Sequence, residues 1–306
     1  MKKLLIPFML LLVLIISACS NSPKEKKQVA SKETKSETIT YLSENGPVEV
    51  PAHPKRVVLL SGFTGNVIDL GVNVVGVDVW SKNNPTFAKE LKDVAEVSDE
   101  NLEKIIELEP DLIIGLSNIK NLEKLKQIAP TVTYTWGKVD YLTQHLEIGK
   151  LLNKENEAQK RIDDFKTQAE ETGKEIKAKV GEDATVSVIE SYGKDLYVFG
   201  DNWARGTEIL YQAMHLKMPE KVKEMALKSG YYTLSAEVLP EYAGDYVILS
   251  KYSDADTSFQ QTDTYKNIPA VKNNHVYEMN GQGASFSDPI TLDKQLAFFK
   301  KSFLEK

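Results

Sequence analysis

The side chains best suited to hold a ligand gather in one short stretch near position 200. Tyr197 and Trp203 offer broad aromatic faces, and Arg205 offers a planar fork of N–H donors that stays charged at physiological pH. Gly200 and Gly206 bracket Trp203 and Arg205, which predicts a sharp loop leading into a helix. Such a loop suits a compact ligand with acceptor oxygens and a carbon skeleton. The spacing leaves an alternative open for each residue: Trp203 could be a core residue, and Arg205 could form a surface salt bridge.

Two halves of similar pattern must position this loop. Apolar runs typical of strands alternate with short helical patterns between Val57 and Tyr134, which predicts a parallel sheet covered on both faces. A hairpin signal at Asn45-Gly46 precedes this half, and the alternation restarts at Thr185. The sequence therefore predicts an α/β protein with two Rossmann-like lobes.

A long helix is expected between the two halves. Apolar residues recur at helical spacing from Glu155 to Lys179, and charged residues fill the other face. Asn153 offers an N-cap and Gly181 a stop, so the helix would have about 25 residues and a length of roughly 37 Å. That length favours one rigid strut between two lobes over a surface helix on a single domain. Because a continuous helix resists hinge rotation, we expect small lobe movements.

The N-terminus has the pattern of an exported, lipid-anchored protein. Lys2 and Lys3 precede an apolar run over Leu4–Ile16 that is too short to span a membrane comfortably, which indicates a secretory signal peptide. The following Ser17-Ala18-Cys19 resembles the bacterial lipobox, in which the cysteine is acylated and becomes the new N-terminus. Cys19 is the only cysteine, so the exported chain forms no internal disulfide. We expect an extracytoplasmic protein anchored to the membrane of a Gram-positive bacterium.

Composition and charge complete the predicted division of the chain. Loss of residues 1–18 removes two lysines from the 38 basic residues, so 36 basic and 44 acidic residues remain, a formal net charge of −8. This balance argues against nucleic acid as a partner. The predicted parts are a signal peptide over residues 1–18, a lipid-anchored flexible tether over 19–38, an N-terminal α/β lobe over 39–152, a linking helix over 153–181 and a C-terminal α/β lobe over 182–306.

Several short motifs accompany the lipobox and the long helix. They are Val50-Pro51, Pro54–Val58, Leu102-Glu103, Pro110–Ile114 and Ile128–Val132. Together these features resemble the helix-linked substrate-binding lipoproteins of ABC importers for iron–siderophores, haem and cobalamin. The loop Leu196–Gly206, with Asp288-Pro289 and Thr291–Asp293, is similar to one subgroup, the ferric-hydroxamate (ferrichrome and ferrioxamine) receptors of the Fhu type.

This resemblance implies a receptor that binds a ferric hydroxamate siderophore and passes it to an ABC permease with its ATPase. The siderophore holds the iron, so the resemblance implies no cofactor, no metal ligand from the protein and no enzymatic activity, and a monomer is expected. It assigns Tyr197, Trp203 and Arg205 to the siderophore. Because their loop lies outside the predicted sheets, we expect Arg205 to be dispensable for folding.

The N-terminal half must supply the opposite wall of the cleft. Trp80, Asn118 and Trp136 follow the ends of predicted strands, where doubly wound sheets bind ligands; packing or solvent exposure is the alternative for each. The receptors that this chain resembles have aromatic residues just before the Asp-Pro. In the corresponding segment of this chain, Gly281–Phe286, the one aromatic residue is Phe286. We therefore expect Phe286 to contact the siderophore at a wider rim.

Glu103 and Glu237 form a second candidate constellation, because each falls near the start of a predicted helix in its own half. The resemblance implies that both dock into arginine pockets of the permease, where such charge pairs set orientation and encounter rate. The alternative is the ordinary preference of acidic side chains for helix N-termini.

The scarcity of arginine bears on the class of ligand. Only Arg56, Arg161 and Arg205 occur, and only Arg205 falls in the predicted binding loop. A tris-catecholate would favour several converging cations, so one arginine suits a neutral hydroxamate complex better, although lysines can substitute.

Haem binding and enzymatic turnover fit the sequence less well. Haem often takes a His, Met or Tyr axial ligand, but the four histidines show no shared spacing. An exported hydrolase or reductase of such complexes is disfavoured, because the chain has no Gly-x-Ser-x-Gly elbow, no Walker loop and no cysteine pair.

Overall fold

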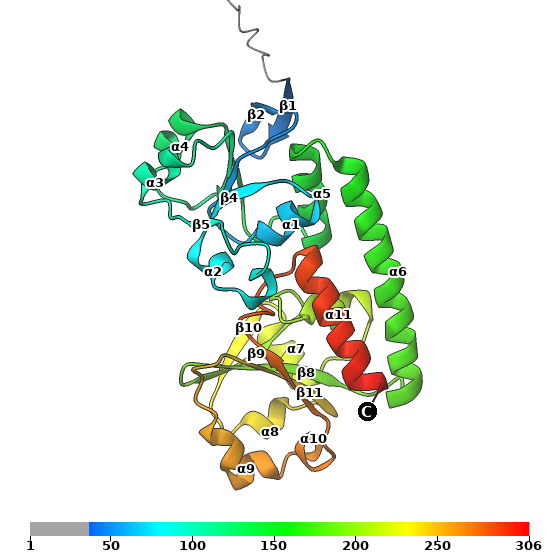
Figure 1. Ribbon diagram of the computed structural model, residues 1–306. Coiled ribbons are helices and arrows are strands. Elements are labelled where there is room, and N and C mark those ends of the chain that lie inside the picture. The colour runs from blue at the N-terminus through cyan, green and yellow to red at the C-terminus, as the bar shows by residue number, and fades with distance from the viewer. Residues whose placement is uncertain (1–36, 306) are drawn as a thin grey trace, which may run out of the picture. The chain divides into compact units, whose positions relative to one another are not determined.

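The computed structural model describes residues 37–305 of the chain. The predicted signal peptide, the predicted lipidation site Cys19 and nearly all of the predicted tether lie outside the described residues, as does residue 306. The described residues all belong to one compact unit. Within the described part, a short hairpin and two five-stranded sheets are arranged along one long helix (Figure 1).

The described chain opens with the predicted hairpin. Its strands are β1 (Thr38–Ser43) and β2 (Gly46–Pro51), which pair antiparallel. The turn residues are Glu44 and Asn45, one position before the predicted Asn45-Gly46, because Ser43 pairs with Gly46. The hairpin packs on the core of the N-terminal lobe.

The N-terminal lobe is a parallel sheet with helices on both faces, as predicted. Its elements are β3 (Val57–Leu59), α1 (Thr64–Asp69), β4 (Val74–Val77), α2 (Val79–Lys82), η1 (Pro85–Phe87), β5 (Ala95–Glu96), α3 (Leu102–Glu107), β6 (Leu112–Leu116), α4 (Leu122–Ile128), β7 (Thr131–Tyr134) and α5 (Tyr141–Leu151). The strand order is β5-β4-β3-β6-β7. Alternate residues of β3 face opposite cores: Val57 and Leu59 pack with α1 and α5, whereas Val58 packs with α3 and α4.

The C-terminal lobe has a mixed sheet of order β10-β9-β8-β11-β12. Its elements are β8 (Val186–Tyr192), β9 (Asp195–Phe199), η2 (Glu208–Ala213), α7 (Glu220–Ala226), β10 (Tyr231–Leu234), α8 (Leu239–Tyr242), β11 (Tyr246–Lys251), η3 (Ser258–Gln261), α9 (Asp263–Lys266), α10 (Pro269–Lys272), β12 (Val276–Asn280) and α11 (Pro289–Leu304). β8, β11 and β12 are parallel, and β9 pairs antiparallel with both of its neighbours, β8 and β10. Tyr192 pairs with Asp195, so only two residues join β8 to β9, which is too short for a crossover helix.

The long helix α6 (Glu155–Val180) joins the lobes, as predicted. Its buried face spans both cores, since Ala158 packs in the N-terminal core while Phe165 and Ile176 pack in the C-terminal core. The predicted N-cap is one residue early: Lys154 occupies that position without a side-chain cap, and Asn153 has a φ of 56°. Gly181 ends the helix with a φ of 101°.

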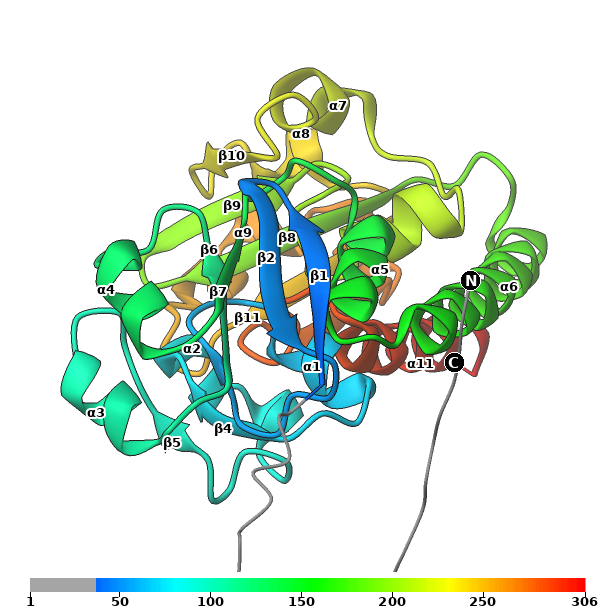
Figure 2. The ribbon, with the colours of Figure 1, turned by 90° about the horizontal axis from the view of Figure 1, so that it is seen from above.

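Helix α11 makes a second connection between the lobes. It runs beside α6 in both views (Figures 1 and 2). Ile290, in its first turn, packs against the N-terminal core, whereas Leu296 and Phe299 pack in the C-terminal core. The region predicted as C-terminal lobe therefore ends in a helix that also contacts the other lobe.

Arg161 ties three helices together at this junction. From α6, its Nε donates to Asp69 Oδ1 of α1 at 3.1 Å, and its Nη2 donates to Asp293 Oδ2 at 2.6 Å and to the Pro289 carbonyl at 3.0 Å in α11. Arg161 and Asp69 are largely buried, so water screens this pair less than a surface pair. The junction thus has charged contacts in addition to apolar packing.

His145 is buried beside this cluster. Its Nδ1 lies 3.1 Å from Asn66 Oδ1 and its Nε2 lies 3.7 Å from Asp69 Oδ2. Burial lowers the pKa of His145 from 6.5 to about 4, and the positive charge of Arg161 acts in the same direction. The neutral imidazole is the form that fits the fold.

Acidification is therefore expected to destabilise the fold through His145. Between pH 6.5 and about 4 the unfolded chain binds a proton at this position that the folded chain does not, so stability present above pH 6.5 is lost as the pH falls. At about 1.4 kcal/mol per pKa unit, the loss reaches up to about 3 kcal/mol. Urea unfolding at pH 7 and pH 4.5 should show a smaller loss for His145→Gln than for the parent. The exposed His53→Gln serves as control and should follow the parent; an equal loss in all three chains would contradict the prediction.

Candidate ligand-binding cleft

Two adjoining cavities are each lined by residues from both lobes. One, which we call the aromatic cavity, has a volume of about 500 Å³ and is lined among others by Trp80, Tyr192, Tyr197, Trp203, Arg205 and Tyr231. The other, which we call the polar cavity, has a volume of about 530 Å³ and is lined among others by Trp136, Lys138, Asp140, Asp201, Glu208 and Asp288. Trp203 and Phe286 line both. Each volume falls in the range of roughly 300–1,000 Å³ that is usual for small-molecule sites.

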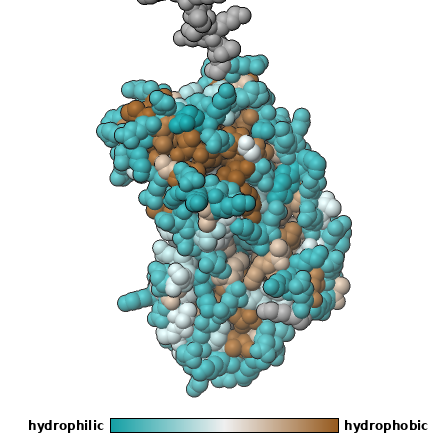
Figure 3. All heavy atoms as spheres, in the orientation of Figure 1, coloured by the Kyte–Doolittle hydropathy of each residue, from teal (hydrophilic) through white to brown (hydrophobic). Residues whose placement is uncertain are grey.

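Exposed aromatic side chains concentrate in this cleft. Among the described residues, the large aromatic side chains exposed by at least 40% are Trp80, Trp136, Tyr192 and Tyr231, and each lines one of the two cavities. On the face drawn in Figure 3, the largest hydrophobic area lies on the N-terminal lobe, and smaller ones lie below it among hydrophilic residues. A concave set of exposed aromatic rings is what an apolar ligand skeleton requires.

The rings of the cleft also contact one another. Trp203 lies at its centre, with ring centroids 6.5 Å from Trp136 of the N-terminal lobe and 5.2 Å from Tyr231 of the C-terminal lobe. Tyr197 contacts Tyr231 at 6.0 Å. Because Trp136 and Trp203 come from different lobes, their edge-to-face contact connects the two walls of the cleft.

The loop before η2 has an unusual backbone that presents Trp203 and Arg205. Ala204, Arg205 and Gly206 all have positive φ, at 57°, 55° and 82°. Two hydrogen bonds hold this conformation: the Ala204 N–H donates to Glu208 Oε1 and the Arg205 N–H to the Ala284 carbonyl, both at 2.9 Å. A left-handed backbone at residues other than glycine is costly and tends to occur at functional sites. As predicted, the loop is sharp and leads into a helix, but that helix, η2, is a π-helix.

The sequence led us to expect that Arg205 offers its whole fork of N–H donors to a ligand. In the structure, part of that fork is already in use. Its Nε and Nη2 donate to the two carboxylate oxygens of Glu190 on β8, at 2.8 and 2.9 Å. Burial disfavours the charged guanidinium, but the hydrogen bond and charge of Glu190 outweigh it and raise the pKa of Arg205. Ser250 also donates to Glu190 Oε2 at 2.8 Å, and the guanidinium lies 5.1 Å from the centroid of Phe199. The group is therefore rigidly held with part of its N–H donors in use.

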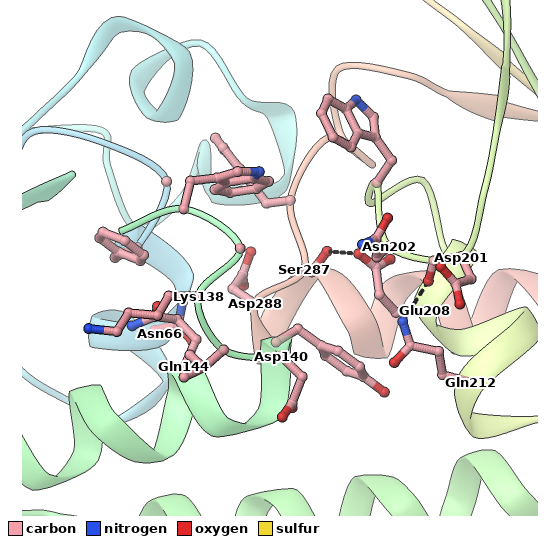
Figure 4. A pocket seen from close by; sticks show the side chains of 18 residues that line it. Asn66, Lys138, Asp140, Gln144, Asp201, Asn202, Glu208, Gln212, Ser287 and Asp288 are labelled. Carbon is pink, nitrogen blue, oxygen red and sulfur yellow. Dashed lines mark hydrogen bonds between the residues drawn. The ribbon is translucent and has the colours of Figure 1, made fainter. Parts of the chain in front are cut away.

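Buried carboxyl groups line the polar cavity (Figure 4). Ser287 donates to Glu208 Oε1 at 2.9 Å, and Asp288 accepts the N–H groups of Ile290 and Thr291 at 3.0 and 3.1 Å as the N-cap of α11. Burial raises the pKa of Glu208, and burial raises that of Asp288 to about 6 despite these hydrogen bonds. Both carboxyl groups have partners within the protein, so they fix the walls of the cavity and do not form a free acid–base pair.

The structure places most of the predicted site residues at these cavities. Tyr197, Trp203, Arg205, Trp80, Trp136 and Phe286 all line one or both. Asn118 lines neither: it is exposed in the turn after β6, where the Ile119 N–H donates to the Leu116 carbonyl. Glu103, in the first turn of α3, and Glu237, in the turn before α8, are exposed and line neither cavity.

Sequence reasoning missed several residues of the C-terminal wall. Glu190 and Tyr192 lie at the end of β8, and Tyr252 follows β11 directly. Their places at or just beyond the ends of two neighbouring strands are the signal that indicates them, since doubly wound sheets bind ligands there. Tyr231 opens β10, a short strand that the sequence pattern did not indicate.

Within residues 37–305, no group of three or more His, Cys, Asp or Glu side chains could hold a metal ion. None of the helices in this range has both the length and the apolar character needed to cross a bilayer. The cleft itself presents aromatic faces, Arg205, Lys138 and several carboxyl groups, a combination suited to an organic ligand.

Comparisons with known proteins agree with this geometry. A family model for periplasmic binding proteins matches residues 57–282. The iron(3+)-hydroxamate-binding protein FhuD of Bacillus subtilis (strain 168) is 38% identical, covering 96% of this chain and 95% of its own. The solved FhuD protein from S. pseudintermedius is 35% identical with a TM-score of 0.80, covering 88% of this chain and 99% of its own. FhuD2 of Staphylococcus aureus, solved with bound ferrioxamine B, is 32% identical with a TM-score of 0.78. The match covers 82% of this chain and 99% of the FhuD2 chain. This chain belongs to the periplasmic binding protein family.

Proposed function

We propose that this protein is a receptor that binds ferric hydroxamate siderophores at the cell surface and delivers them to an ABC permease for iron uptake. The observation that carries the proposal is the aromatic cavity, in which exposed rings from both lobes surround one rigidly held arginine. A ferric hydroxamate has oxygens that already saturate its iron, so it requires N–H donors for those oxygens and aromatic faces for its carbon skeleton. Both are present in one cavity of suitable size.

Calorimetric titration with a panel of ligands tests this proposal. The panel consists of a ferric tris-hydroxamate, the same hydroxamate without iron, haem and cobalamin. We expect one-to-one binding of the ferric hydroxamate and at least tenfold weaker binding of the others. Tighter binding of haem or cobalamin, or no binding of the ferric hydroxamate, would refute the proposed ligand class.

The protein acts by binding and release, without turnover of its ligand. The buried carboxyl groups at the cleft are engaged as a helix cap and as hydrogen-bond partners of their own loop. Chromatography of the ligand after prolonged incubation should return it unchanged and stoichiometric with the protein. Catalytic conversion or loss of iron would identify a hydrolase or a reductase.

The receptor is held to the outer face of the cell membrane through acylated Cys19 and works as a monomer. The lipobox pattern before Cys19 supports this anchoring. The ligand brings its own iron, so the receptor requires no cofactor.

Glu103 and Glu237 are the proposed contacts with the permease. Both are exposed, lie on different lobes and line neither cavity. The double variant Glu103→Ala, Glu237→Ala is expected to keep siderophore affinity within about twofold of the parent, because no cleft residue changes, yet to lose most iron uptake in cells. Titration of the purified variant and uptake of labelled ferric hydroxamate measure the two effects. Lost affinity in the purified variant would assign these glutamates to the fold or the cleft.

A further inference from the structure

We propose that Glu190 sets the charge selectivity of the aromatic cavity: it neutralises Arg205, so that this cavity prefers ferric complexes without net charge and rejects anionic ones. The inference rests on the proposed function and adds to it the net charge of the ligand.

The charge balance of the aromatic cavity is the first observation. Among the described residues that line it, Glu190 and Arg205 carry formal charges at neutral pH, and the others are aromatic rings and Ser285. The two side chains form a two-point ion pair with nitrogen–oxygen distances of 2.8 and 2.9 Å. The cavity thus contains one positive and one negative charge in direct contact.

The burial of this pair is the second observation. The side chains of Arg205 and Glu190 are exposed by only 15% and 4%. Water screens such charges poorly, so a ligand at the guanidinium also experiences the carboxylate behind it. Ser250 fixes that carboxylate through Oε2 at 2.8 Å. Arg205 therefore supplies directed N–H donors without a net positive field.

This arrangement favours a neutral ligand for a simple reason. A tris-hydroxamate of Fe(III) has no net charge at its iron centre and needs only hydrogen bonds to its oxygens. A tris-catecholate carries three negative charges, whose loss of hydration must be offset by cations in the site. Since Glu190 cancels the charge of Arg205, the aromatic cavity does not offer this compensation.

Glu190→Gln tests the inference, because it keeps the shape of the side chain and removes its charge. Two probes are titrated, a neutral ferric tris-hydroxamate and a ferric tris-catecholate of charge −3. Affinity for the neutral probe should fall up to about tenfold, because Arg205 is held less firmly, and affinity for the anionic probe should rise by about tenfold or more. The ratio of the two affinities is the decisive quantity, since general damage to the fold would lower both.

Three further variants control this experiment. Glu278→Gln makes the same change on β12, in a residue that pairs with Lys251 at 2.7 Å and lines neither cavity, and it should keep the parental ratio. Glu190→Asp keeps the charge and should retain the preference for the neutral probe. Combining Glu190→Gln with Arg205→Gln removes both charges and should restore discrimination against the anionic probe, although with weaker binding overall.

The possible outcomes separate this inference from the proposed function. If the parent binds neither probe, the proposed function is wrong. If the parent binds both probes equally, or if Glu190→Gln keeps the parental ratio, the function can stand but Glu190 does not set selectivity. Should Glu190→Gln fail to fold, the parent itself decides: it must bind the neutral probe at least about a hundredfold more tightly than the anionic one.

Discussion

Trp203→Ala is expected to lower the affinity for a ferric tris-hydroxamate by about a hundredfold. Trp203 lines both cavities and contacts Trp136 and Tyr231, so its removal takes away contact area and loosens two other walls of the cleft. Loss of such a central aromatic contact costs roughly 2–4 kcal/mol, and each 1.4 kcal/mol is about tenfold in affinity. Calorimetric titration of parent and variant measures the change.

Trp203→Phe is the matched control, because it retains an aromatic face in the same loop. We expect its affinity to stay within about tenfold of the parent, between the parent and the alanine variant. Thermal unfolding distinguishes the two roles open to this residue. If Trp203→Ala binds as the parent does while its melting temperature drops, Trp203 is a packing residue and the ligand lies elsewhere.

Gly65→Ala should destabilise the fold strongly, by about 3 kcal/mol. A Cβ atom on Gly65 would lie 1.7 Å from Asp288 Oδ1 and 2.8 Å from Asp288 Cβ. The Asp288 carboxylate cannot swing away freely, because it caps α11 through Ile290 and Thr291. Either the cap is lost or α1 and α11 move apart, and overpacking of this kind costs about 1–3 kcal/mol before the lost cap adds about 1 kcal/mol.

Gly71→Ala is the control for Gly65→Ala, because it strains the backbone without a steric clash. Gly71 has a φ of 69° but has open space around it, so we expect a loss of only about 1 kcal/mol. Urea unfolding of both variants measures the difference. Equal losses in the two variants would show that α11 is not held tightly against α1, and that the second connection between the lobes is weak.

Long, strongly periodic segments could be predicted from the sequence. Helix α6 was recognisable because its apolar face continues through both cores, as Ala158 and Phe165 illustrate. The N-terminal sheet was recognisable because a parallel sheet buried on both faces requires apolar runs such as the one at Ile113. Short elements were not: η2 is a π-helix, and β9 turns back from β8 within two residues, features that periodicity does not encode.

Contacts between side chains of different elements could not be predicted from the sequence pattern. The pattern indicated Arg205 as a site residue. Nothing in the pattern paired this loop residue with Glu190 on β8. The expectation that Arg205 is dispensable for folding took no account of this pair: Arg205→Ala would leave the buried Glu190 carboxylate without its cation, and we expect it to lose about 3–5 kcal/mol of stability. Asn118 followed a strand end as required, but the turn there leaves it outside both cavities.

The three tryptophans allow a direct test of the central claim, because all of them, Trp80, Trp136 and Trp203, line the cleft. The measurement is intrinsic tryptophan fluorescence during titration with a neutral ferric tris-hydroxamate, whose absorbing iron centre quenches nearby indole rings. We predict saturable loss of most of the fluorescence, complete at one equivalent of ligand, and recovery when the corresponding gallium hydroxamate displaces the iron complex. Unchanged fluorescence, or quenching that rises linearly without saturation, would contradict a ferric hydroxamate site between the lobes.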